Sequence, residues 1–123
     1  MSKGIQIPPE QFQEIQKLGI QISQINMEIN QTAAKLWYHG KEVKKSNIVL
    51  KEISQIPDGV TMYRAVGRMF LHTPQKLVKE QLENKITEDE KEVSSLDQKQ
   101  QYLTKQKTEM EKSLRELVAM ITK

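Results

Sequence analysis

The sequence contains no cysteine, so it offers neither a disulfide bond nor a thiolate ligand for a metal ion. Aromatic residues are scarce at 5%, and hydrophobic residues make up 37% of the chain. Ordinary globular domains contain roughly 45–50% apolar residues. A pair of long helices needs fewer, because it buries only a narrow seam. The composition therefore favours an extended helical protein over a globular enzyme.

The residue patterns of common catalytic and metal sites are also lacking. There is no glycine-rich phosphate loop, and the two histidines, His39 and His72, are far apart in the sequence. Each is expected to be a surface or interface residue. The acidic run TEDEKE at 87–92 is typical of a solvated helix face rather than of an acid–base pair. The sequence predicts a protein that is not an enzyme and that needs no cofactor or metal.

No stretch reaches the roughly 20 apolar residues that span a bilayer, so no membrane is expected as a partner. The first residues, MSKGIQIPPEQF, lack the apolar run of a secretory signal, and the lack of cysteine fits a reducing compartment. The net charge of +3 comes from 19 basic and 16 acidic residues that alternate along the chain. This pattern disfavours nucleic acid as a partner, although a basic coiled-coil nucleic-acid binder remains an alternative.

A heptad pattern, with apolar residues spaced alternately by three and four, predicts a coiled-coil helix over about residues 8–44. Pro8 and Pro9 suit its first turn. Gly40 lowers the helix propensity and marks the expected end. The predicted seam consists of Ile15, Leu18, Ile22, Ile25, Ile29, Leu36 and Val43, with Thr32 and His39 at weaker positions.

A second heptad pattern predicts a helix over residues 74–122. Thr73 followed by Pro74 is typical of an N-cap and a first helical residue. Asp89, Gln100 and Lys107 interrupt the seam, where polar residues either fix the register or are simply solvated. The apolar seam positions are Leu82, Ile86, Val93, Leu96, Leu103, Met110, Leu114, Leu117 and Ile121.

Residues 45–72 fit neither heptad. An apolar face at 49–56 predicts a short helix, and Pro57-Asp58-Gly59 predicts a turn. The run TMYRAVGRMFLHTP at 61–74 then predicts a β-hairpin, with its turn at Gly67.

This hairpin is too apolar for two helices to cover. An isolated two-stranded hairpin is marginally stable at best, and its open edges invite pairing with another chain. Hairpins from several chains are therefore expected to close a β-barrel; the alternative is a hairpin that folds back on its own stem as a mere connector. The predicted assembly residues are Val60, Met62, Tyr63, Val66, Gly67, Met69, Phe70 and Leu71.

The hairpin and its flanking helices resemble the β-type subunits of the prefoldin family. The resemblance is carried by Met62, Tyr63, Val66, Gly67, Arg68, Met69 and Phe70. Arg64 and Ala65 depart from the family motif. The resemblance implies a single domain over residues 1–123. Its implied fold is mainly α, a long antiparallel two-helix coiled coil with a central β-hairpin that joins an oligomeric β-barrel.

The resemblance also implies a function. Prefoldins are heterohexamers of two α-type and four β-type subunits that need neither ATP nor a cofactor. They capture unfolded proteins, above all actin and tubulin chains, and deliver them to the cytosolic group II chaperonin. The implied location is the cytoplasm, with a nuclear role left open. The competing interpretation is a coiled-coil scaffold or tether that associates with itself through its hairpin.

An antiparallel pair of helices would bring the two ends of the chain together. Both ends carry apolar residues, and methionine adapts well to varied partners. We expect these ends to bind apolar segments of clients; the alternative is that they merely finish the coiled coil. The predicted client-binding residues are Ile5, Ile7, Phe12, Leu114, Leu117, Val118, Met120 and Ile121.

Trp37, Tyr38 and His39 form a cluster of rings on the first helix. A binding patch and packing near the base of the stem are both open interpretations. Packing is favoured, because large aromatic side chains bury much apolar area.

Overall fold

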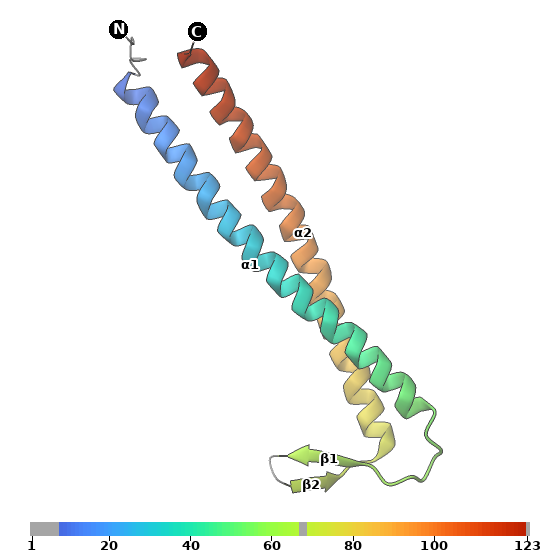
Figure 1. Ribbon diagram of the computed structural model, residues 1–123. Coiled ribbons are helices and arrows are strands. Elements are labelled where there is room, and N and C mark those ends of the chain that lie inside the picture. The colour runs from blue at the N-terminus through green and yellow to red at the C-terminus, as the bar shows by residue number, and fades with distance from the viewer. Residues whose placement is uncertain (1–7, 67–68, 123) are drawn as a thin grey trace. The chain divides into compact units, whose positions relative to one another are not determined.

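The computed structural model describes residues 8–66 and 69–122, without the side chains of residues 64–66, 70 and 71. Two long helices make up most of the chain (Figure 1). The elements in order are helix α1 (Pro9–Ser54), strand β1 (Tyr63–Val66), strand β2 (Met69–His72) and helix α2 (Gln75–Ile121). The chain divides into two units, which we call the terminal unit (residues up to 34 and from 97 on) and the hairpin unit (residues 35–96).

Helix α1 continues through Gly40 to Ser54. The expected end near Lys44 and the separate short helix after it are therefore wrong. Glycine costs a helix interior about 1 kcal/mol, but the apolar seam continues on both sides of Gly40. Val43 is half-buried and Ile53 is only 7% exposed. Burial of these side chains outweighs the local weakness at the glycine.

In the terminal unit, the first part of α1 runs antiparallel to the last part of α2 (Figure 1). The predicted seam is confirmed here, because Ile25 and Leu103 are 8% and 4% exposed. The side-chain amide of Gln100 donates a hydrogen bond of 3.2 Å to the carbonyl of Ile29. Lys107 instead pairs with Glu111, four residues further along its own helix.

In the hairpin unit, the rest of α1 runs antiparallel to the first part of α2. Ile53 and Ile86 are buried between them. Helix α2 begins at Gln75, one residue after the predicted Pro74. The side-chain Nε2 of Gln75 donates hydrogen bonds to the backbone carbonyls of Ile53 and Ile56, at 3.0 and 3.2 Å. It thereby supplies partners to carbonyls that the end of a helix leaves open.

The connection between the helices turns at Pro57-Asp58-Gly59, as predicted. Gly59 has a φ of +91° and the Val60 amide donates to the Pro57 carbonyl at 3.4 Å. Strands β1 and β2 then pair antiparallel, with Tyr63 opposite His72 and Val66 opposite Met69. The predicted turn residue Gly67 lies outside the described residues, and a barrel formed by several chains stays a prediction.

Candidate functional site

The hairpin presents apolar side chains on both faces of its sheet. Tyr63 is 65% exposed and Met69 is 69% exposed. Side chains alternate between faces along a strand. Because Tyr63 lies opposite His72 and Met69 lies opposite Val66, Tyr63 and Met69 belong to opposite faces. Neither face is therefore fully covered by the described part of the chain.

The sheet also has open edges. It consists of β1 and β2 alone among the described residues, so each strand has one edge without a neighbouring strand. Unpaired strand edges are templates for pairing with further chains. The ring of Tyr63 packs edge-on against that of His72, with centroids 6.1 Å apart, across the pair. That contact orders the hairpin but leaves its edges available.

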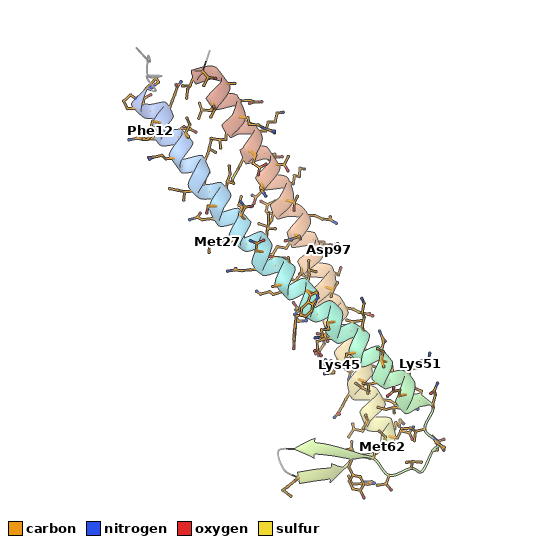
Figure 2. All side chains as sticks on the ribbon, viewed as in Figure 1. Phe12, Met27, Lys45, Lys51, Met62 and Asp97 are labelled. Atoms are coloured by element: carbon orange, nitrogen blue, oxygen red, sulfur yellow. The ribbon has the colours of Figure 1, made fainter. Side chains whose placement is uncertain are left out.

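A mainly apolar groove lies where the hairpin meets the two helices. Met62 is half-buried beside the first turns of α2 (Figure 2). The groove has a volume of about 440 Å³, and its lining includes Met62, Tyr63, Val49, Ile53, Val78 and Leu82. The predicted assembly residue Val60 is 48% exposed nearby in the sequence. This groove could hold an apolar side chain from another chain.

The remaining predicted assembly residues are only partly described. Val66, Phe70 and Leu71 lie in the strands, but their side chains are outside the description. Gly67 lies outside the described residues altogether. The assignment of all eight residues to assembly stays a prediction.

A polar cluster crosses the seam of the hairpin unit. His39 Nδ1 lies 3.0 Å from Asp89 Oδ1. Lys85 donates a hydrogen bond to Glu42, and its Nζ lies 3.6 Å from Asp89 Oδ2. The hydrogen bond from Lys85 lowers the pKa of Glu42, and the same bond raises the pKa of Lys85. The cluster therefore links α1 to α2 by polar contacts that form only when the two helices are in this register.

The sequence reasoning missed this cluster. The seam patterns predict His39 and Asp89 as weak or polar seam positions but do not pair them, and the acidic run at 87–92 predicts a solvated face, whereas only 13% of the Asp89 side chain is exposed. A signal was present, because His39 and Asp89 both occupy weak positions in their heptad seams. Pairing them required the register of two helices that are distant in sequence.

The helix ends in the terminal unit form a second groove, with a volume of about 470 Å³. Leu18 from α1 and Leu117 and Met120 from α2 give it an apolar lining. Its carboxylates come from Glu10, Glu14 and Glu116, and its other lining residues are Gln11 and Ser113. A groove lined by apolar side chains and carboxylates can hold an extended or helical segment.

Three predicted client-binding residues are exposed in the same unit. Phe12 in the early turns of α1 is 48% exposed (Figure 2), and Val118 and Met120 are 40% and 67% exposed. Leu114, Leu117 and Ile121 are half-buried, as seam positions should be. Ile5 and Ile7 lie outside the described residues. Client binding by this set stays a prediction.

Trp37 and Tyr38 on α1 do not pack near the base of the stem, which was the interpretation that the sequence favoured. Trp37 and Tyr38 are 68% and 54% exposed. Their neighbours Leu36 and His39 occupy the seam, which leaves positions 37 and 38 on the outward side of the helix. The favoured packing at the base of the stem is therefore wrong within this chain.

The described residues were also compared with the requirements of a metal site and of a membrane-spanning helix. No three histidine or acidic residues there are arranged to hold a metal ion. Neither helix there has a stretch long and apolar enough to cross a membrane.

Two long paired helices joined through a short hairpin with exposed Tyr63 and Met69 define a coiled-coil class of protein. The sequence matches the Prefoldin subunit family over residues 13–120. The chain belongs to this family, because the match covers most of its length.

Individual relatives agree with the β-type resemblance of the hairpin motif. The chain is 33% identical to Prefoldin subunit 1 of Arabidopsis thaliana over 75 residues, which cover 61% of this chain and 59% of that relative. It is 30% identical to Prefoldin subunit beta of Sulfurisphaera tokodaii over 118 residues, 92% of this chain and 87% of that relative. The match thus spans less than two thirds of the plant relative.

Among solved structures, the chain shares the fold of the prefoldin beta subunit from Thermococcus strain KS-1. The TM-score is 0.57 at 22% identity, and the match covers 95% of this chain and 93% of the other. This likeness concerns the fold. It confirms a mainly helical prefoldin fold with two long helices.

Proposed function

We propose that this chain is one subunit of a heterohexameric, ATP-independent co-chaperone in the cytoplasm. The complex captures unfolded proteins, such as actin and tubulin chains, at its helix ends and delivers them to the cytosolic group II chaperonin. The observation that carries the proposal is the exposure of Tyr63 and Met69 on opposite faces of the hairpin. If a neighbouring chain packed against each face of the hairpin, the side chains of Tyr63 and Met69 would both be covered.

Assembly through the hairpin follows from the cost of that exposure. Burying a large apolar side chain stabilises a structure by roughly 1.5–3 kcal/mol. Strands from α-type and β-type sister subunits would pair with the open edges of β1 and β2, and Val60 and Met62 would pack at the root. Val66, Gly67, Phe70 and Leu71 would complete the same interface.

Client capture is supported by the terminal unit. Phe12, Val118 and Met120 are exposed there, and the groove of this unit is lined by Leu18, Leu117 and Met120. One such surface is small and would bind weakly. Several copies in one assembly would bind the same client at a high effective concentration, which raises the overall affinity without any new contact.

The test is a triple variant, Phe12→Ser, Val118→Ser and Met120→Gln, assembled with the partner prefoldin subunits. We expect it to form the hexamer but to lose most of its suppression of aggregation by denatured actin. The matched control is Ile20→Ser with Met27→Gln, because these residues are each 60% exposed on α1 in the same unit. The control should retain full suppression.

Two outcomes would count against the proposal. Equal suppression by the triple variant and the wild type would remove the client-binding assignment. A stable homodimer or homotetramer that ignores the partner subunits would instead support the scaffold or tether.

A further inference from the structure

The outward side of α1 in the hairpin unit combines exposed apolar and basic side chains. Trp37 and Ile48 are 68% and 61% exposed. Four exposed lysines lie among and beside them, two of which, Lys45 and Lys51, are labelled in Figure 2. We call this surface the basic aromatic face; it consists of Trp37, Lys41, Lys44, Lys45, Ile48 and Lys51.

Five of these residues form one stripe along the helix. Positions 37, 41, 44, 48 and 51 are spaced by four, three, four and three. This is the spacing that aligns side chains on one side of a helix. It repeats the heptad of the seam, but on the side that faces away from α2. Side chains at this spacing can all contact a second helix that lies along the stripe.

The lysines of this face form no ion pair with the described part of the chain. No carboxylate there lies within 4.0 Å of the ammonium groups of Lys41, Lys44, Lys45 or Lys51, because the ion pairs of this unit involve His39 and Lys85. Glu42 is already bonded to Lys85. Lys41 Nζ lies 5.0 Å from the centre of the Trp37 ring instead.

We propose that the basic aromatic face binds an acidic amphipathic helix of another protein. Aliphatic side chains of that helix would cover Trp37 and Ile48, and its glutamate or aspartate residues would pair with the lysines. A single nucleic-acid strand could stack on Trp37 and neutralise the lysines, but it would bring no aliphatic group to Ile48. The apolar residue within the basic stripe therefore favours a helix as the occupant.

This surface is separate from the two surfaces of the proposed function. Its residues belong neither to the hairpin nor to the groove at the helix ends. The proposal therefore does not depend on barrel formation or on client capture.

The test uses the full chain, in which Trp37 is the sole tryptophan and reports on its own surroundings. The probe is a synthetic helical peptide with leucine at its seam positions and glutamate elsewhere. We expect a saturable blue shift of Trp37 emission that weakens as salt is raised, since screening reduces exposed charge interactions. The same peptide with lysine in place of glutamate should give no shift.

Variants then locate the site. Lys44→Glu with Lys45→Glu should weaken peptide binding by about tenfold or more, because like charges then face each other. Ile48→Gln should also weaken it. The matched control is Lys105→Glu with Lys112→Glu, two exposed lysines of the terminal unit, which changes the net charge equally and should leave binding unchanged. Hexamer mass and client capture should stay at wild-type levels in all of these variants.

Three results would overturn the proposal. The first is an emission spectrum that the acidic peptide leaves unchanged, or an equal loss in the control pair. The second is tighter binding of a single-stranded oligonucleotide that is insensitive to Ile48→Gln, which would make nucleic acid the occupant. The third is protection of Lys41, Lys44 and Lys45 from lysine labelling on assembly with partner subunits, which would make the face a subunit interface.

Discussion

The helical seam and the hairpin are both apolar, but only the seam is covered within one chain. Leu103 and Ile86 in the seam are 4% and 9% exposed, whereas Tyr63 and Met69 in the hairpin are 65% and 69% exposed. A helix satisfies its backbone hydrogen bonds internally and needs one covered stripe. A two-stranded sheet keeps two faces and two edges. The comparison separates residues that hold this chain together from residues that this chain leaves uncovered.

The sharpest form of this comparison is a pair of alanine substitutions. Leu103→Ala should lower the free energy of unfolding by about 2–5 kcal/mol, because it leaves a cavity in the seam. Met69→Ala should change it by less than about 0.5 kcal/mol in the isolated chain, as for other surface positions. Denaturant unfolding followed by circular dichroism measures both. Similar losses in the two variants would mean that the hairpin is covered after all.

The polar cluster tests whether the seam is also fixed in register by charge. Asp89→Ala should cost about 1–3 kcal/mol, since it leaves the half-buried His39 without its partner. The double variant with His39→Ala should show a coupling free energy of about 0.5 kcal/mol or more. A double-mutant cycle of unfolding free energies gives this coupling. Simple additivity would show that the two residues do not stabilise each other.

Alanine substitution of Gly40 in α1 and of Gly59 in the turn before the hairpin tests how the stability of each element depends on glycine. Gly40→Ala should stabilise the chain by about 0.5–1 kcal/mol, because the residue is inside α1. Gly59→Ala should destabilise it, because its φ is +91°. A new Cβ meets no atom within 4 Å at either position, so backbone conformation alone should separate them. Opposite shifts in melting temperature are expected, and shifts of the same sign would contradict this account.

The smallest expected effect is the pH dependence of the exposed ion pair in the hairpin unit. The hydrogen bond from Lys85 lowers the pKa of Glu42 in the folded state. A carboxyl with a lowered folded-state pKa stabilises the fold above its unfolded value, about 4.3, and loses this contribution as the pH falls through the folded value. Glu42→Gln should therefore be less stable than the wild type near neutral pH and equal to it in acid. Glu52→Gln, an exposed control without an ion pair in the described structure, should show no such trend.

Much of the fold could be predicted from the sequence, because both heptads and the Pro57-Asp58-Gly59 turn are local patterns. The end of α1 could not be predicted from local propensity. Gly40 weakens the helix where it stands, but the seam beyond it, up to Ile53, is a tertiary effect. The exposure of Trp37 was predictable in principle, because the seam position of Leu36 turns its neighbour outward.

Less of the candidate sites than of the fold could be predicted from the sequence. The pairing of His39 with Asp89 depends on the alignment of two helices, which one heptad pattern does not define. The roles predicted for the assembly and client-binding residues involve chains other than this one. Their exposure can be observed here, as for Tyr63 and Phe12, but their partners define their function.

The central claim is that the hairpin is completed by sister subunits. The direct measurement is native mass spectrometry of the full chain produced with its partner prefoldin subunits, as wild type and as Tyr63→Glu with Met69→Glu. We predict a hexamer that contains the wild type, and none that contains the variant, while circular dichroism shows the same helix content in both. A wild-type chain that stays monomeric beside its partners, or a variant that assembles equally well, would contradict the account.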